Sequence, residues 1–358
     1  MKNKKLIWFL FLVFALALIF ALVWSLKDGE EKNEISKTPL EKVKVQAGWI
    51  LNGEFANICS AISEGYYEEE GLDVELIPGG PSGASFIVAT NALVQDESID
   101  IAVDGDLVPL LMGLSKEREE EKIRAKAFAA FWNESPYGFI VRSDSGIENF
   151  VDLATKTKLD GSKYKIGVTA DSVAQFAIAK HANVTVDDLS LTTVGFDASP
   201  FLSGQVDALA AYWTTQAYEV EKAGIDYNFL SYGSIPGFSQ PSMIAIARDE
   251  TIKNNPQMLE KWLRATIKGT EFVKANPEKA ADHVLSDVCG GKVLDREQEL
   301  WMINKSIPLF GENNMGSLNP EQFRSFAESY HNLEQIPMQP SIESMLDLSI
   351  LEKIYSTK

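Results

Sequence analysis

Short apolar runs alternate with helical patterns along the chain after residue 42. Runs rich in apolar and β-branched residues predict strands at residues 43–50, 72–77, 99–103 and 123–132. Apolar residues at helical spacing predict helices at residues 56–64, up to about residue 94, and at 107–115. Strands that alternate with helices in this way indicate an α/β fold with a mostly parallel sheet.

The same alternation starts again at Tyr137. Strands are predicted at residues 137–144, 164–169, within 184–196, at 206–213 and at 227–233, with helices between them. From residue 242 the pattern changes to one further strand followed by helices. Three of these helices are predicted to start at Asn-Pro, because Asn caps helices well and Pro suits their first position. The pairs are Asn255-Pro256, Asn276-Pro277 and Asn319-Pro320.

The N-terminus has a different pattern. A lysine-rich segment, residues 1–5, precedes 19 apolar residues from Leu6 to Trp24. This length suits a membrane span better than the apolar core of a signal peptide. No small-residue cleavage site follows, so residues 6–26 are predicted to be an uncleaved transmembrane anchor rather than a cleaved signal. The lysines would keep the N-terminus in the cytoplasm, and residues 27–42 would link the anchor to a body outside the plasma membrane.

The charge balance and the few cysteines and histidines bear on which ligands and bonds to expect. The net charge of −18 reflects 51 acidic and 33 basic residues, so nucleic-acid binding is not expected. The two cysteines and three histidines show no metal-ligand spacing, so no metal site is expected. Cys59 lies in the apolar stripe of a predicted helix and is expected to be a buried free thiol. A disulfide to Cys289 is the alternative in an oxidising compartment.

Three segments carry a resemblance to a known family. They are GWILNGEF with GYYEEEGLDVELIPGGP, LSGQVDALAAYWTTQAYEVEKAGID, and IKNNPQMLEKWLRATIKGTEFVKANPEKAA. They resemble the NMT1/THI5-like (SsuA/THI5) substrate-binding proteins, and the resemblance runs from about Val43 to Leu333. It implies a two-lobed periplasmic-binding-protein fold of type II. Lobe one would comprise residues 43–132 and 238–358, and lobe two residues 137–232. The crossings at 133–136 and 233–237 would then form a hinge that closes on a ligand.

Ligands of open α/β sheets bind beyond the C-terminal ends of the strands, so residues that follow strands are the candidates. The predicted ligand-binding residues are Trp49, Asn52, Glu54, Gly80, Ser82, Asp104, Asp106, Trp132, Asn133, Thr169, Asp171, Ser172, Tyr212, Trp213, Tyr232 and Phe238. The alternatives are core or hinge packing for the aromatic residues, and helix capping for Asp and Ser.

The candidate loops hold aromatic, amide and carboxyl side chains but no Arg or Lys. This favours a flat heterocycle over a sulfonate, taurine or nitrate, which need cations or dense N–H donors. Family members that bind thiamine-type pyrimidines often carry Asn-Glu-Pro after the strand at 206–213, where this chain has Thr214-Thr215-Gln216. The PGGP corner is closer to the riboflavin-type branch, so both ligand types stay open.

The resemblance implies the extracytoplasmic binding component of an ABC importer. Its partners would be a small ligand, a permease, an ATPase subunit and the plasma membrane. No cofactor or catalytic residue is expected, because the Cys-rich motif of related pyrimidine-synthesising enzymes is absent, as is a GxSxG nucleophile elbow. A membrane-tethered ligand-sensing module is the alternative.

Overall fold

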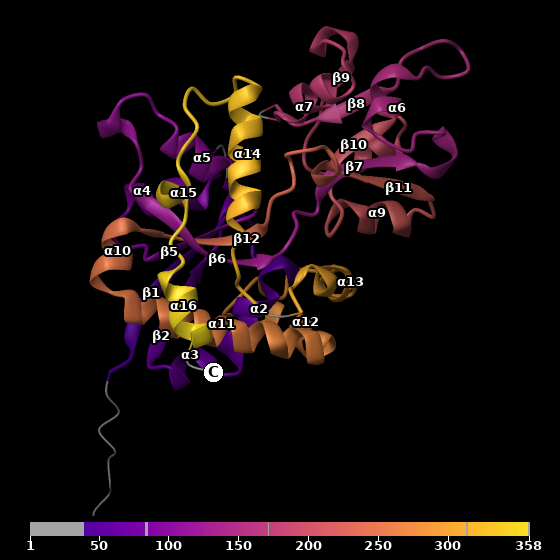
Figure 1. Ribbon diagram of the computed structural model, residues 1–358. Helices are drawn as coiled ribbons and strands as arrows, with labels where there is room; N and C mark the ends of the chain where they lie inside the picture. The colour runs from indigo at the N-terminus through magenta and orange to yellow at the C-terminus, as the bar shows by residue number, and fades with distance from the viewer. Residues whose placement is uncertain (1–38, 83–84, 171, 313, 357–358) are drawn as a thin grey trace, which may run out of the picture. The chain divides into compact units, whose positions relative to one another are not determined.

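The computed structural model describes residues 39–82, 85–170, 172–312 and 314–356. The chain from Leu40 on forms one compact unit (Figure 1). The predicted membrane anchor, residues 6–26, lies outside the described residues. Among the residues that are described, no helix has the length and apolar character needed to span a membrane.

Ten strands form two five-stranded sheets. The first sheet has the order β2-β1-β5-β12-β6, with β1 at Glu41–Ala47, β2 at Leu72–Ile77, β5 at Ile101–Asp104, β6 at Ala125–Trp132 and β12 at Ser242–Arg248. β1 runs parallel to β2 and β5, whereas β12 runs antiparallel to β5 and β6. The sheet is therefore mixed, because the chain re-enters it from the second sheet in the opposite direction.

The second sheet has the order β11-β7-β10-β8-β9. Its strands are β7 at Tyr137–Arg142, β8 at Lys165–Val168, β9 at Ser190–Thr193, β10 at Ala208–Tyr212 and β11 at Tyr227–Ser231. β8, β9 and β10 are parallel, and β7 is antiparallel to β10 and β11. Below, lobe one and lobe two mean the first and second sheets with the helices that pack on them.

The helices occupy the segments between and after the strands. Those of lobe one that the site depends on are the 3₁₀ turn η1 at Gly53–Phe55, α2 at Ala56–Ser63, α4 at Ala89–Gln95, α5 at Val108–Leu114, α11 at Pro256–Ala275, α12 at Pro277–Val284, α13 at Arg296–Ser306 and α14 at Pro320–Asn332. The remaining helices of lobe one are α3 at Tyr66–Glu69, α10 at Asp249–Asn254, α15 at Ile342–Met345 and α16 at Ser349–Ser356. The helices of lobe two are α6 at Phe150–Thr155, α7 at Ala174–His181, α8 at Ser199–Leu202 and α9 at Gln216–Lys222.

The three predicted Asn-Pro helix starts are confirmed, since α11, α12 and α14 all begin at the proline. Only Asn319 caps its helix through its side chain, which accepts a hydrogen bond from the Glu321 amide. The PGGP corner differs from the prediction. It forms a short hairpin, β3 at Gly80–Ser82 and β4 at Ser85–Ile87, before α4.

The core of lobe one is built around Trp262 of α11, which is fully buried. Its ring packs edge-on against Phe128 and Phe131 of β6, at centroid distances of 5.8 and 6.0 Å. On its other side lies Tyr67, whose hydroxyl is 2.7 Å from the Thr266 hydroxyl. α11 therefore holds α2 and α3 against the sheet. These two helices belong to the chain segment that follows β1, so the start of that segment is held in place as well.

Cys59 of α2 and Cys289 form a disulfide, with their Cα atoms 5.8 Å apart. The expected free thiol at Cys59 is thus wrong. The reason lies in the tertiary structure, because α12 packs beside α2 and brings residue 289 next to residue 59, although 230 residues separate them.

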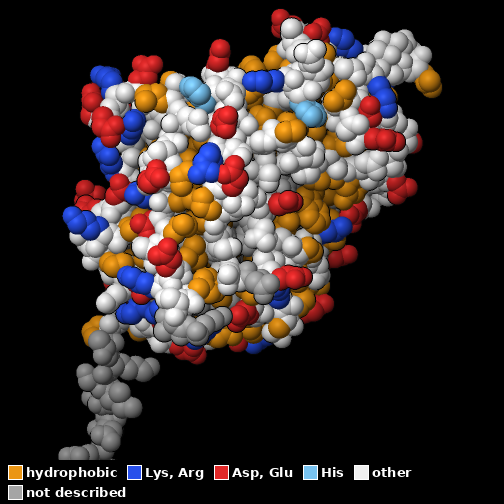
Figure 2. Space-filling view, viewed as in Figure 1, with side chains coloured by type: hydrophobic (Ala, Val, Ile, Leu, Met, Phe, Trp, Pro, Cys, Tyr) orange, Lys and Arg blue, Asp and Glu red, His pale blue; other side chains and the backbone are white. Residues whose placement is uncertain are grey.

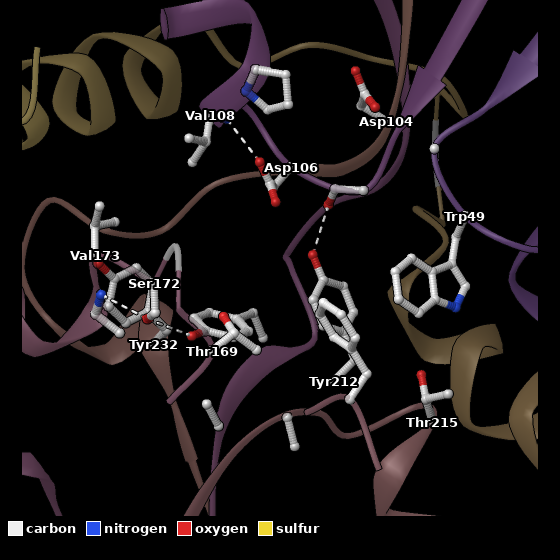
Figure 3. Close-up of a pocket in the computed structure, with 18 of the residues that line it drawn as sticks. Trp49, Asp104, Asp106, Val108, Thr169, Ser172, Val173, Tyr212, Thr215 and Tyr232 are labelled. Atoms are coloured by element: carbon white, nitrogen blue, oxygen red, sulfur yellow. Dashed lines mark hydrogen bonds between the residues drawn. The ribbon is translucent and has the colours of Figure 1, made fainter. Parts of the chain in front are cut away.

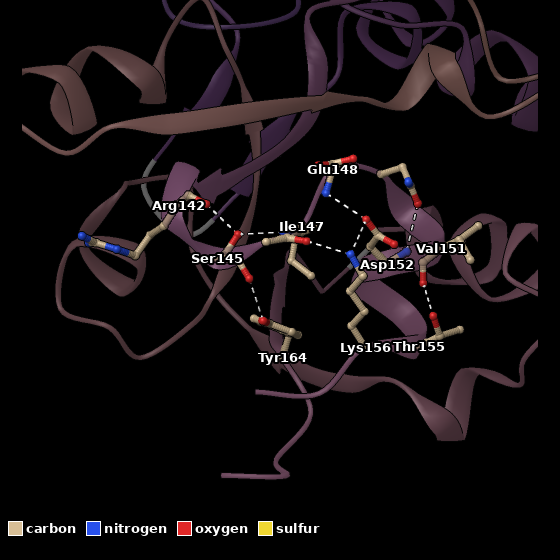
Figure 4. A network of polar contacts seen from close by, with 11 residues as sticks. Arg142, Ser145, Ile147, Glu148, Val151, Asp152, Thr155, Lys156 and Tyr164 are labelled. Carbon is tan, nitrogen blue, oxygen red and sulfur yellow. Dashed lines mark hydrogen bonds and ion pairs between the residues drawn. The ribbon is translucent and has the colours of Figure 1, made fainter. Parts of the chain in front are cut away.

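A surface network of polar contacts supports the start of α6 in lobe two (Figure 4). The Asn149 side chain caps the helix by accepting from the Asp152 amide at 2.9 Å. Asp152 pairs with Lys156 at 3.0 Å, and the Tyr164 hydroxyl donates to the Ser145 carbonyl at 2.8 Å. Elsewhere on the surface, acidic side chains are spread among basic ones on the face shown in Figure 2.

Candidate functional site

A cavity of about 620 Å³ lies between the two lobes. Its walls are the segments that follow strands: Gly48 and Trp49 after β1, Asp104 to Asp106 at the end of β5, Thr169 after β8, and Tyr212 with Thr215 at the end of β10. The C-terminal ends of these strands converge on it, as expected for an α/β ligand site. Figure 3 shows Trp49 on one side of Tyr212, with Thr169 and Ser172 on the other.

Aromatic side chains make up much of the cavity wall. Tyr137 lies at the centre of a tyrosine cluster, with its ring centroid 5.8 Å from that of Tyr212 and 5.4 Å from that of Tyr232. Trp49 of lobe one meets Phe196 of lobe two at 5.2 Å. Burial raises the pKa of Tyr137 to about 12, so its hydroxyl is neutral near pH 7. These faces suit a flat apolar ring.

Three carboxyl groups line the cavity, and among the described residues its wall contains no Lys, Arg or His. Asp104 is a structural group. It accepts hydrogen bonds from the Ala89 amide at 3.2 Å, from the Thr90 amide at 2.9 Å and from the Thr90 hydroxyl. It thereby anchors the start of α4 to β5. Burial raises the pKa of Asp104 to about 6 even though these donors favour the charged form.

Glu54 connects the two lobes. It lies in η1 of lobe one, and its carboxyl oxygen accepts from the hydroxyls of Thr214 and Thr215, both at 3.2 Å, in lobe two. Burial raises the pKa of Glu54 to about 7. Glu299 of α13, which accepts from the Gly53 amide at 2.5 Å, also has its pKa raised to about 7, by burial and by the nearby Glu54.

Replacing Glu54 with glutamine is expected to weaken the pH dependence of stability. The folded protein holds the Glu54 proton up to about pH 7, whereas the unfolded chain releases it near 4.5. Stability should therefore fall as the pH rises between these values, by about 3 kcal/mol for this group. Glutamine cannot ionise but keeps an acceptor for Thr214 and Thr215. Urea midpoints at pH 5 and pH 8 would measure the change.

The raised pKa values of Glu299 and Asp104 also make the free energy of unfolding fall as the pH rises. The stability of Glu54→Gln should therefore still depend on pH, but less steeply than that of the wild type. The control is Glu134→Gln, because Glu134 is exposed. Equal pH slopes for wild type and Glu54→Gln would contradict the assignment.

The structure brings eight of the predicted site residues to the cavity wall. They are Trp49, Glu54, Asp104, Asp106, Thr169, Ser172, Tyr212 and Tyr232. Asp171 lies outside the described residues, and of Ser82 only the backbone in β3 is described. Gly80 is not part of the wall but supports it. It has φ +71°, and a Cβ there would lie 3.0 Å from the Trp49 ring, so only glycine lets Trp49 take its place.

Five predicted residues lie away from the cavity wall. Asn52 is buried and caps η1 by accepting from the Glu54 amide at 3.1 Å. Trp132 packs against Phe310, and Asn133 is exposed. Trp213, the first residue after β10, packs against Phe229, while Tyr212 at the end of the strand takes the cavity side. Phe238 packs behind Tyr232, at 5.1 Å between ring centroids.

Sequence reasoning missed other wall residues. Thr215 and Gln216 directly follow β10, and Phe196 follows β9, so the rule used for the other strands could have found them. Tyr137 begins β7 rather than ending a strand. Tyr330 belongs to α14, almost a hundred residues beyond the last strand of lobe two, and no local signal marks it.

Two α/β lobes with an aromatic cavity between their strand ends define a periplasmic-binding-protein fold. The solved periplasmic aliphatic sulphonate binding protein SsuA from Escherichia coli has this fold, with a TM-score of 0.60 and 14% identity over 85% of this chain and 91% of that chain. The chain belongs to the NMT1/THI5 like family, whose model matches residues 52–280.

Two relatives with detectable sequence similarity to this chain are named as binding proteins. The formylaminopyrimidine-binding protein of Halalkalibacterium halodurans is 23% identical over 69% of this chain and 71% of its own length. The riboflavin-binding protein RibY of Chloroflexus aurantiacus is 20% identical over 76% of this chain and 73% of its own length. Other relatives are 4-amino-5-hydroxymethyl-2-methylpyrimidine phosphate synthases of Saccharomyces cerevisiae, at 22–23% identity.

Proposed function

We propose that the protein is the extracytoplasmic solute-binding component of an ABC importer and that its ligand is a small aromatic heterocycle of thiamine-pyrimidine or riboflavin type. The observation that carries the proposal is the cavity wall. It combines tryptophan, phenylalanine and tyrosine faces with carboxyl groups, and within the described residues it offers no cationic side chain. Flat rings with hydrogen-bond donors match such a wall.

The same wall argues against an anionic ligand. Nitrate and sulfonates are bound through cationic side chains or dense N–H donors, whereas carboxylates repel them. The likeness to sulfonate-binding and nitrate-binding structures concerns the fold, at 12–14% identity.

A binding role is favoured over catalysis. Several relatives are synthases, so the question matters for this chain. Among the described wall residues there is no Cys or His, and each of the carboxyls Glu54 and Asp104 is hydrogen-bonded to structural partners. Among the described wall residues, no hydrogen bond pairs a nucleophile with a His or carboxylate base in the way that covalent catalysis requires, apart from the contacts of Glu54 and Asp104 with their structural threonine partners.

The importer mechanism would use the hinge between the lobes. The lobes close on one ligand, the closed form docks on a permease, and ATP hydrolysis by a separate subunit drives opening and release. The predicted N-terminal anchor would hold the protein at the outer face of the plasma membrane and raise its concentration near the permease.

A ligand screen on the full-length protein tests the proposal. Thermal shifts would be measured with riboflavin, 4-amino-5-hydroxymethyl-2-methylpyrimidine, an alkanesulfonate and nitrate. A ligand that binds only the folded state stabilises it by about 2.7 kcal/mol at 100 times its Kd. A heterocycle should raise the melting temperature, and the two anions should not. A shift with the anions alone would refute the proposal.

A further inference from the structure

Asp106 is the cavity carboxyl whose hydrogen bonding is incomplete. It follows β5 in the Asp-Gly-Asp corner, and one of its oxygens accepts from the Val108 amide at 2.8 Å at the start of α5. No hydrogen bond among the described residues reaches its other oxygen, unlike the fully used carboxyl of Asp104. Figure 3 shows the Asp106 carboxyl directed toward the open middle of the cavity. Helix capping therefore accounts for one carboxyl oxygen of Asp106 and leaves the role of the other oxygen open.

Four tyrosines line the same cavity as this carboxyl: Tyr137, Tyr212, Tyr232 and Tyr330. Besides burial, the negative charge of Asp106 contributes to the raised pKa of each of them. None of their hydroxyls donates to it. The Tyr212 hydroxyl is directed to the Gly105 carbonyl at 3.4 Å, and the Tyr137 hydroxyl lies 3.4 Å from the Ser172 hydroxyl.

An independent observation also points to a ligand at this place. Tyr232 lines the cavity and is 2% exposed, yet among the described residues its hydroxyl makes no hydrogen bond of ordinary geometry. The Tyr330 hydroxyl lies close enough for a weak hydrogen-bonding interaction that lowers the pKa of Tyr232, but this contact falls outside ordinary hydrogen-bond geometry. Buried hydroxyls are rarely left unpaired, because the lost hydration is not replaced. A ligand polar group beside Asp106 would satisfy this one.

We propose that Asp106 and the surrounding tyrosines form a subsite for a positively charged nitrogen, so that the protein selects cationic heterocycles such as an ammonium-bearing aminopyrimidine over neutral ones. The inference rests on the proposed heterocycle-binding function. A carboxylate facing a cavity without a cationic partner is poorly stabilised, and an ammonium group would supply a charge-assisted hydrogen bond. The tyrosine faces would add cation–π attraction.

A matched pair of ligands tests the charge directly. 4-Amino-5-aminomethyl-2-methylpyrimidine carries an ammonium group near pH 7, and the 5-hydroxymethyl compound is nearly the same size but neutral. Isothermal titration of the full-length protein should give at least about tenfold tighter binding for the ammonium compound, as expected for a hydrogen bond to a charged group. Equal affinities in the wild type would overturn the inference without requiring any variant.

Two variants then identify the carboxyl. Asp106→Asn keeps the oxygen that caps α5 and should bring the two affinities within about threefold of each other, whereas Glu134→Gln, at an exposed carboxyl that is not part of this wall, should keep the preference for the ammonium compound. A preference that survives in Asp106→Asn would overturn the assignment to Asp106.

Binding measurements with riboflavin and an alkanesulfonate distinguish a failure of this inference from a failure of the proposed function. Binding of riboflavin but neither pyrimidine would overturn the cation subsite and leave the heterocycle function standing. Binding of the sulfonate alone would refute both.

Discussion

Replacing Trp49 with alanine is expected to weaken binding of the heterocyclic ligand by about 100-fold. A Trp ring buries roughly 150–250 Å² in contacts, and a stacked ligand would use one face of it. Losing about 100 Å² of apolar contact plus the ring interaction amounts to about 3 kcal/mol. Trp49 is half-buried at the end of β1, so the fold should tolerate the change. Isothermal titration would measure Kd.

Trp213→Ala is the matched control, because the chain places this tryptophan one residue beyond Tyr212 but against Phe229 instead of the cavity. The affinity of Trp213→Ala for the heterocyclic ligand should stay within about threefold of the wild-type affinity, since the variant loses no contact with the cavity wall. Trp49→Phe should recover most of the affinity by restoring an aromatic face. Equal losses in Trp49→Ala and Trp213→Ala would show that the ligand does not stack on Trp49.

Reducing the Cys59–Cys289 disulfide is expected to destabilise the protein by about 5 kcal/mol. The bridge closes a loop across 230 residues, and reopening it returns conformational entropy to the unfolded chain. Reduction removes no atoms from the core, so the change reports the cross-link itself. The denaturant midpoint would be compared with and without a phosphine reductant.

A double variant, Cys59→Ala with Cys289→Ala, provides the control for this prediction. It should be less stable than the oxidised wild type, and the reductant should have no further effect on it. Cys59 is fully buried, so part of the variant's own loss will come from the volume of the missing sulfur. A wild-type midpoint that the reductant leaves unchanged would contradict the stabilising role of the bridge.

Much of the fold follows from local sequence. The alternating runs located the ten strands of the two sheets, and the Asn-Pro pairs located the starts of α11, α12 and α14. Strand ends could be recognised because apolar runs give way to Gly, Asp and Asn. The short β3–β4 hairpin was missed, because two three-residue strands carry too little pattern to separate them from a turn.

The candidate site was predictable only where it follows strands. Trp49, Asp106, Thr169 and Tyr212 were found because the carboxyl ends of parallel strands converge on one edge of each sheet. The same rule could not decide between Tyr212 and Trp213, since both are aromatic and consecutive residues at the end of a strand point in different directions.

The sequence by itself determined the strands, the helix starts and a set of aromatic and acidic residues without cations, because these depend on patterns within a few residues. Only the tertiary structure decided which of them meet. It placed Glu54 against Thr214 and Thr215, Tyr330 beside Tyr232, and Cys59 beside Cys289. The members of these pairs are between 98 residues (Tyr232 and Tyr330) and 230 residues (the two cysteines) apart, and their contact depends on how whole helices and sheets pack, which no local pattern encodes.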